Sequence, residues 1–289
     1  MEANKQHRRG VLALLGTTLL WATTFVMMKS ALGDVPPFWV MTLRFTGAAL
    51  LLLVISGKRL KKLDRGTVIG GTKMGLLLFA AYYLMTLGLE LISPGKNAFL
   101  ITGYTIVTPF IAWAWHKTRP DGYNLIAAAM CFVGMGLASL SGPAELGKGE
   151  LLTISSGLFY ALHIVCSGRE TQGRDPILIT LVQMATIAVL SFAGALIWEE
   201  FPTNVPAYTW ANLAYLSIVC TGLCFLLQTY GQKYTTPMET SIILPFESVF
   251  GALFSVAMGE QIHLREGIGY ALMFLAAIVS EAKPGQKRE

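Results

Sequence analysis

Stretches of membrane-spanning length and apolar composition recur from one end of this chain to the other, and they restrict the fold more than any other feature. A helix needs about 20 apolar residues to cross the hydrocarbon core of a bilayer. The chain is 54% hydrophobic and 13% charged, whereas soluble domains contain about 25% charged residues. We therefore predict an all-α integral membrane protein.

Ten stretches qualify as transmembrane helices, and the connections between them are short. The first follows a basic segment, as the core of a signal peptide would, but it is too long for such a core and we predict a retained helix. The predicted spans are 11–32, 36–56, 68–90, 97–115, 123–141, 151–167, 177–198, 208–230, 238–258 and 267–279.

Lysine and arginine are distributed unevenly between the two ends of these spans. One set of ends carries most of them, including five between residues 58 and 65, while the other carries only Lys29, Lys96, Lys148 and Arg265. Because cytoplasmic loops are enriched in cations, we predict a multi-pass protein of the inner or plasma membrane with both termini in the cytoplasm. The net charge of +5 follows from this pattern and does not indicate nucleic-acid binding.

The second half of the chain repeats the first. A shift of 139 positions aligns Gly10 with Gly149, Pro37 with Pro176, Trp21 with Tyr160 and Arg44 with Gln183. The pattern predicts two five-helix repeats, residues 1–141 and 142–289. Since five is an odd number, the second repeat enters the membrane from the opposite side. Inverted repeats are a transporter architecture with a binding site near the bilayer midplane.

Several short motifs occur in a fixed order along the chain. They are Leu20-Trp21-Ala22-x-x-Phe25, Arg44, Ser93-Pro94-Gly95-Lys96-Asn97-Ala98-Phe99-Leu100 with Pro109, and Phe246-Glu247-Ser248-Val249-Phe250 with Gly259-Glu260. Together they resemble the EamA-type branch of the drug/metabolite transporter superfamily. The resemblance implies ten helices in two inverted repeats, a cavity lined by helices 1, 3, 4, 6, 8 and 9, and the movement of small metabolites, often outward, on a proton or metabolite gradient.

This sequence departs from the family pattern in two places. The family usually has Glu-Pro-Val where this chain has Glu247-Ser248-Val249, and here the proline is Pro245. The first half also lacks the Gly-Glu that normally ends the fourth helix and has His116-Lys117 instead. The local backbone shape around Glu247 therefore does not transfer directly from the family.

Glu247 is the strongest candidate for a functional residue, because a charge near the centre of a span costs several kcal/mol and usually faces a cavity or a partner. In one interpretation it binds a proton or a cationic group and couples that binding to transport. In the other it is a structural carboxylate paired with Arg44 or with helix ends.

Further candidates are polar and aromatic residues within the spans. Trp21 and Tyr160 would stack on a planar or cationic substrate, His163 would relay protons, and Arg44 would act in gating or anion contact. Each also has an ordinary structural interpretation in core packing or helix-to-helix hydrogen bonding. The predicted substrate-binding or coupling set is Glu247, Trp21, Thr24, Arg44, Tyr82, Tyr83, Tyr104, Tyr160, His163 and Gln228.

Several classes of function are disfavoured. The four cysteines and four histidines have no metal-ligand spacing, and we predict neither a metal nor a cofactor. No G-x-x-x-x-G-K-[ST] loop occurs, so ATP is not the direct energy source. An intramembrane enzyme would have only Cys166 or Cys220 with His163, without motif spacing. A single off-axis glutamate argues against a channel, which usually carries a ring of charges.

The sequence thus predicts a secondary active transporter working by alternating access, not an enzyme. Its expected partners are the bilayer, protons and a small organic metabolite that is amino-acid-like, cationic or zwitterionic. We expect proton-coupled export by a monomer or weak dimer. The alternative is an uncoupled facilitator or exchanger, with uptake included, in which Glu247 binds a substrate ammonium group.

Overall fold

The structure, a computed structural model, describes residues 2–92, 94–117, 119–139, 147–247, 249–250 and 263–281, and all regular secondary structure in them is helical. Ser93, Ser248, Gly259 and Glu260 of the sequence motifs lie outside the described residues, as do residues 251–258 of the predicted ninth span. The prediction of an all-α protein is confirmed for the part of the chain that the structure describes.

The described residues of the first half form seven α-helices and one short 3-10 helix. They are α1 (Glu2–Trp21), α2 (Thr24–Leu32), α3 (Pro37–Ser56), η1 (Gly57–Lys62), α4 (Arg65–Leu91), α5 (Pro94–Ile101), α6 (Tyr104–His116) and α7 (Gly122–Ser139). The helices that follow residue 146 are α8 (Lys148–Glu170), α9 (Pro176–Trp198), α10 (Ala207–Ser217), the π-helix η2 (Ile218–Leu223), α11 (Cys224–Tyr234), α12 (Pro237–Ile243) and α14 (Leu264–Glu281).

Among the described residues, six helical stretches are long and apolar enough to cross a membrane, and they correspond to the first, second, third, sixth, seventh and eighth predicted spans. They are Asn4–Leu32, Pro37–Lys62, Arg65–Leu91, Lys148–Glu170, Pro176–Trp198 and Ala207–Tyr234. The fourth predicted span is divided between α5 and α6, and the ninth is interrupted after α12. A multi-pass membrane protein is therefore supported, whereas the count of ten spans stays a prediction.

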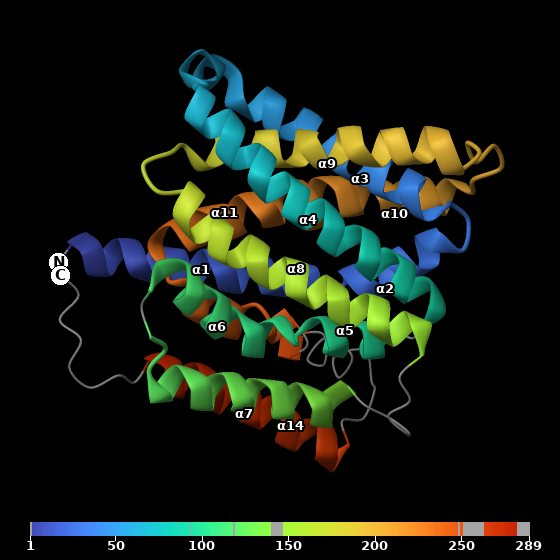
Figure 1. The fold of residues 1–289 in the computed structure, drawn as a ribbon. Helices are drawn as coiled ribbons and strands as arrows, with labels where there is room; N and C mark the ends of the chain where they lie inside the picture. The colour runs from blue at the N-terminus through green and yellow to red at the C-terminus, as the bar shows by residue number, and fades with distance from the viewer. Residues whose placement is uncertain are drawn as a thin grey trace.

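The helices run side by side, and the main pairs join the first half of the chain to the second (Figure 1). Helix α4 packs against α8 and α9, α3 against α9, α1 against α11, and α7 against α14. The Gly71-x-x-x-Gly75 motif lies at one of these contacts. A Cβ atom on Gly71 would come within 2.6 Å of the Val182 Cβ, and one on Gly75 within 2.6 Å of the Thr186 Cβ. Small residues thus allow α4 and α9 to approach closely.

Candidate functional site

A small cavity of about 30 Å³ lies between helices of both halves, beside the point where α1 meets α2. Six of the ten predicted site residues line it, namely Trp21, Thr24, Tyr82, Tyr104, Tyr160 and Glu247, together with Phe25, Met85 and Ile101. Glu247 is 9% exposed and forms no salt bridge with any residue that the structure describes. The cavity therefore combines one carboxylate with an aromatic wall.

Helix interruptions surround this cavity. The backbone leaves regular helix at Ala22 and Thr23 between α1 and α2, at Thr102 and Gly103 between α5 and α6, and at Leu244 after α12. Within a membrane, such irregular backbone is stable only where protein or water satisfies the freed polar groups. Interrupted helices of this kind form the binding sites of many transporters.

The interruption after α12 has an identifiable cause and an identifiable compensation. Pro245 has no backbone N–H and cannot donate to the carbonyl of Ser241, four residues earlier. The Thr105 hydroxyl on α6 donates to that carbonyl at 3.0 Å. Thr105 of the first half thus satisfies the carbonyl that Pro245 of the second half leaves free. Pro245 itself is two residues before Glu247.

The π-helix η2 exposes a second backbone carbonyl near the cavity. The Cys220 carbonyl accepts a hydrogen bond from the Trp21 indole at 2.7 Å and a longer one from Arg44 Nη2 at 3.4 Å. The Thr221 hydroxyl donates to the Leu216 carbonyl, five residues earlier. Single π-helical turns are rare and frequently occur at functional sites. Here the turn fixes the orientation of the Trp21 ring that lines the cavity.

The aromatic residues contact one another around the cavity. The Tyr104 and Tyr160 rings lie 5.0 Å apart edge to face. Trp21 and Tyr82 each contact Phe225 of α11, at 5.3 Å and 5.8 Å. Phe225 is fully buried behind them. The cavity wall is therefore a continuous, mutually packed aromatic cluster with restricted side-chain freedom, suited to stacking on a planar or cationic group.

Arg44 lies behind the cavity wall and does not line it. It is fully buried, its guanidinium is 5.1 Å from the centre of the Tyr82 ring, and it donates to the Thr221 hydroxyl at 2.5 Å. The structural pairing with Glu247 that the sequence leaves open is absent among the described residues. Arg44 is instead a fixed cation with neutral partners, one aromatic ring away from the cavity.

The remaining predicted site residues also lie outside the lining. Gln228 is bonded to Tyr160, whose hydroxyl donates to the Gln228 carbonyl oxygen at 3.4 Å. The His163 ring stacks on the Tyr160 ring, with the ring centres 5.7 Å apart. Tyr83 stacks between Phe38 and Phe79, at 4.7 Å and 6.0 Å, and is the one member of the set packed in a separate aromatic cluster.

Sequence reasoning missed Phe25, Met85 and Ile101 because they are apolar residues within apolar spans. Helical spacing provided a signal for two of them. Met85 is three residues after Tyr82 and shares a face of α4 with it. Phe25 is four residues after Trp21 within the predicted first span, a spacing that would place both on one face of a continuous helix. Ile101 ends α5 at an interruption that periodicity does not reveal.

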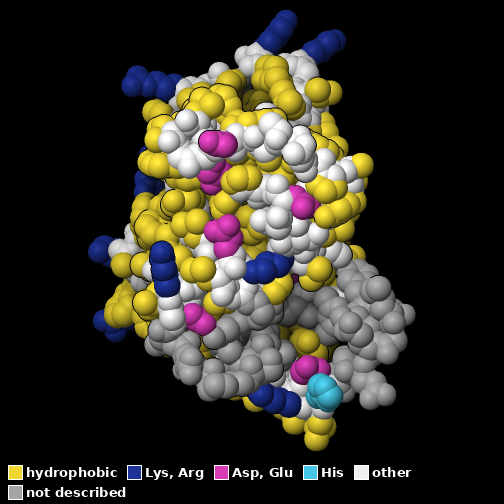
Figure 2. Space-filling view, turned by 90° about the vertical axis from the view of Figure 1, so that its right-hand side faces the viewer, with side chains coloured by type: hydrophobic (Ala, Val, Ile, Leu, Met, Phe, Trp, Pro, Cys, Tyr) yellow, Lys and Arg dark blue, Asp and Glu magenta, His cyan; other side chains and the backbone are white. Residues whose placement is uncertain are grey.

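Polar contacts join the two halves at the end of the bundle away from the start of α1. The Glu199 carboxylate accepts from the backbone N–H groups of Phe38 and Trp39 at the start of α3, at 3.0 and 3.1 Å. Asp34 accepts from the hydroxyls of Tyr208 and Thr209. Acidic side chains are visible across this end of the molecule in Figure 2.

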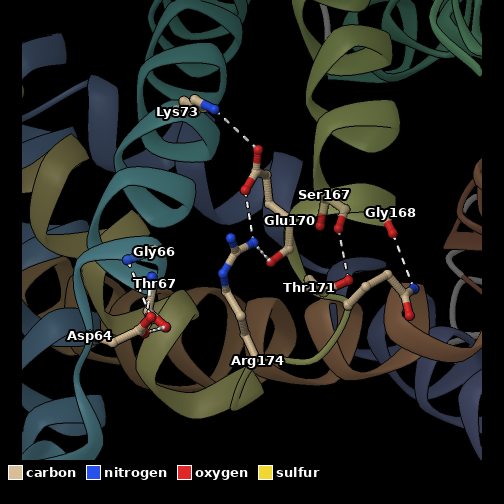
Figure 3. A network of polar contacts seen from close by, with 10 residues as sticks. Asp64, Gly66, Thr67, Lys73, Ser167, Gly168, Glu170, Thr171 and Arg174 are labelled. Atoms are coloured by element: carbon tan, nitrogen blue, oxygen red, sulfur yellow. Dashed lines mark hydrogen bonds and ion pairs between the residues drawn. The ribbon is translucent and has the colours of Figure 1, made fainter.

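A second set of contacts joins the halves at the opposite end. The Glu170 carboxylate is 3.3 Å from Lys73 Nζ and 2.8 Å from Arg174 Nη1, as Figure 3 shows. His7 on α1 lies 3.3 Å from Glu239 on α12. Both ends of the cavity are thus bracketed by polar contacts between elements of different halves.

Comparison with known proteins agrees with this architecture. The profile of the EamA-like transporter family matches residues 8–140 and again 147–281. An uncharacterized transporter of Archaeoglobus fulgidus is 28% identical over 271 residues, covering 93% of this chain and 84% of that protein. The uncharacterized transporter YyaM of Bacillus subtilis is 23% identical over 288 residues, covering 95% of this chain and 94% of that protein.

A solved crystal structure shares the fold, with a TM-score of 0.80 at 18% identity over 94% of this chain and 96% of the other. Two copies of one family profile account for almost the whole sequence. The resemblance seen in the sequence motifs is thereby confirmed. The chain belongs to the EamA-like transporter family and is a multi-pass membrane transporter.

Proposed function

We propose that this protein is a secondary active transporter that exports small amino-acid-like, cationic or zwitterionic metabolites in exchange for protons. The observation that carries the proposal is the cavity in which Glu247 is the single acid among the described lining residues. A carboxylate at membrane depth is neutralised either by a proton or by a cationic group. Competition between these two for one carboxylate couples their movement in opposite directions.

The aromatic lining supports the proposed substrate class. Trp21, Tyr82, Tyr104 and Tyr160 present ring faces and edges around the space next to Glu247. Aromatic faces attract cations and stack on planar groups, while the carboxylate binds an ammonium group. Such a site favours a molecule that carries an amine beside an apolar or planar body.

The proposed movement is alternating access between two five-helix repeats, residues 1–141 and 142–289, inverted relative to each other. The interruptions beside Thr23, Gly103 and Leu244 provide points where helix segments pivot. The contacts at Glu199 and Asp34 close one end and those at Glu170 and Glu239 close the other. We propose that the protein lies in the plasma or inner membrane. The end with Glu170 then faces the cytoplasm, because the basic loops lie there.

The test begins with ligand identification. Purified protein is screened against metabolite classes by thermal shift, because a ligand raises stability according to its concentration relative to Kd whatever the direction of transport. The best ligand is then used in proteoliposomes with an imposed pH gradient. We expect the wild type to accumulate it against its gradient, and the Glu247→Gln variant to lose the dependence on pH. Glu90→Gln is the control, because Glu90 is exposed and is not among the described residues that line the cavity.

The same assay separates the alternative mechanism. An uncoupled facilitator or exchanger, with uptake included, would show counterflow of labelled against unlabelled ligand in the wild type without any effect of the pH gradient. The aromatic wall beside Glu247 is the observation that favours it, since such a wall also serves a carboxylate that only binds an ammonium group. Unchanged, pH-dependent transport by Glu247→Gln would refute coupling through this residue.

A further inference from the structure

Buried polar side chains without a hydrogen-bond partner recur on α8, α9 and α11 of the described structure. Fourteen buried side-chain nitrogen and oxygen atoms have no hydrogen-bond partner in the described part of the chain, and eight belong to His163, Ser167, Gln183, Gln228 and Gln232. We call these five residues the polar track. Each is at most 1% exposed. Since buried polar groups pair with protein or with ordered water, eight such atoms together indicate bound water.

The polar track is built by three helices that pack together. His163 and Ser167 are one turn apart on α8, and Gln228 and Gln232 are one turn apart on α11. Gln183 of α9 adds both of its amide atoms to the set. Helix α11 packs against both α8 and α9, and all five side chains are buried.

One end of the track meets the proposed transport cavity. Tyr160, which lines the cavity with Glu247, donates to the Gln228 carbonyl oxygen and stacks on His163. Beyond the Tyr160 ring, Tyr82 and Tyr104 face Glu247, and Arg44 lies behind Tyr82. The track therefore starts where the carboxylate would exchange its proton.

The other end of the track reaches a charged cluster at the end of the bundle where α1 begins. Glu170 is three residues beyond Ser167 on α8, and it is bonded to Lys73 of α4 and to Arg174 (Figure 3). At the same end Lys233, next to Gln232, donates to the Arg174 carbonyl. From Tyr160 to Glu170 the helix rises about 15 Å, roughly half the thickness of a bilayer core.

We propose that the polar track holds a file of water molecules through which protons pass between the Glu247 cavity and the Glu170 cluster. This inference rests on the proposed proton coupling. His163 takes a proton on one ring nitrogen as the other nitrogen releases one, and the ring ends unchanged in charge. The amides and the Ser167 hydroxyl both donate and accept, so they hold the waters in line without adding a charge.

The first test detects the water itself. Full-length protein in micelles is exposed to X-ray-generated hydroxyl radicals, which oxidise buried side chains only where water is bound, and the products are mapped by mass spectrometry. We expect oxidation of His163 and Tyr160 and none of Phe45, which is equally buried. Oxidation of His163 should fall several-fold in Ser167→Ala and Gln232→Leu, and stay unchanged in Ser191→Ala, a buried unpaired hydroxyl of α9 outside the track.

The second test measures proton delivery with the proton as the probe. Trp21 is kept as the single tryptophan, and its fluorescence is followed after a pH jump on the Glu170 side of proteoliposomes. We expect the signal to need Glu247, and its rate to fall roughly tenfold or more in His163→Phe but not in Ser191→Ala. A pH jump on the opposite side should give equal rates in the wild type, His163→Phe and Ser191→Ala.

The two tests separate failure of this inference from failure of the proposed coupling. A Trp21 response that is identical in Glu247→Gln argues against Glu247 as the proton site, while the footprint still decides whether the track is wet. A track without oxidation, together with wild-type delivery rates in His163→Phe, would overturn the inference alone. If His163→Phe does not fold, Ser167→Ala and Gln232→Leu carry the rate comparison.

Discussion

Thr105 has a role that depends on a proline in the other half of the chain. Its hydroxyl donates to the Ser241 carbonyl, which Pro245 leaves without its helical donor. An unpaired buried carbonyl costs about 1–3 kcal/mol. The hydroxyl therefore stabilises the interrupted helix segment that positions Glu247, and it does so across the interface between the halves.

We predict that Thr105→Val lowers the free energy of unfolding by about 1–3 kcal/mol. Thr108→Val is the matched control, because the Thr108 hydroxyl bonds to the Tyr104 carbonyl of its own helix. Pro245→Ala restores a backbone N–H for Ser241 and should remove most of the effect of Thr105→Val in the double variant. Denaturant unfolding of the wild type, Thr105→Val, Pro245→Ala and the double variant measures the cycle. Additive losses of unfolding free energy would contradict the proposed pairing.

At the scale of single residues, the sequence predicted the identity of many residues around the cavity but not their contacts. A carboxylate at membrane depth is expensive, so Glu247 was identifiable from sequence alone. The bond from Trp21 to the Cys220 carbonyl depends on the π-turn of η2, and no hydrophobic period marks such a turn. For Arg44 the sequence left a gating role and a helix-to-helix role open, and it did not indicate the partners Thr221 and Met28, which are 177 and 16 positions away.

At the scale of elements, the contact between α4 and α9 depends on two glycines. We predict that Gly71→Ala lowers the free energy of unfolding by about 1–3 kcal/mol, because the added Cβ would lie 2.6 Å from the Val182 Cβ and 3.0 Å from the Ile179 carbonyl. Gly122→Ala is the control, since its Cβ would meet nothing within 4 Å. Equal thermal stability of the two variants would show that α4 and α9 can move apart without a loss of unfolding free energy.

Helix α4 begins with a charged cap outside the membrane-spanning segment. The Thr67 side chain and the backbone N–H groups of Thr67 and Gly66 donate to the Asp64 carboxylate and hold its pKa below the usual 3.8. Because the folded-state pKa is the lower one, the stabilisation is present above the unfolded value and is lost as the pH falls through the folded value. The cap thus contributes at neutral pH.

We predict that Asp64→Asn, which keeps an accepting oxygen but not the charge, has a lower Tm than the wild type at neutral pH. The gap should close as the pH falls below about 4. Asp64→Ala, which removes the cap altogether, should be destabilised at every pH. Thermal unfolding from pH 3 to 7 measures these differences, and a gap that widens on acidification would contradict the sign of the pKa shift.

Element prediction from sequence worked where spans are long and continuous. The six longest apolar helices correspond to six predicted spans. The interruption between α5 and α6 was not predicted, because Thr102 and Gly103 lie within a predominantly apolar stretch of spanning length. Helix continuity there is decided by packing around the cavity, which a local pattern does not encode.

At the scale of the whole molecule, the distribution of charge predicts the orientation. We expect fluorescent protein fused to either terminus to be bright in a bacterial host, and alkaline phosphatase inserted between residues 199 and 206 to be active, because the basic loops stay in the cytoplasm. Phosphatase inserted between residues 57 and 63 should be inactive. The reverse pattern of activities would mean that the end with Glu170 faces outward.

The pairing of helices across the two halves also sets the order of events during synthesis. Helices α1, α3 and α7 find their main partners in α11, α9 and α14, all of which leave the ribosome later. At about 5–20 residues per second, the first half waits in the bilayer for roughly ten seconds or more with these faces uncovered. During that interval Arg44 has no Thr221 to receive its hydrogen bond. A newly made first half is therefore a natural client for insertion chaperones and a target for membrane proteases.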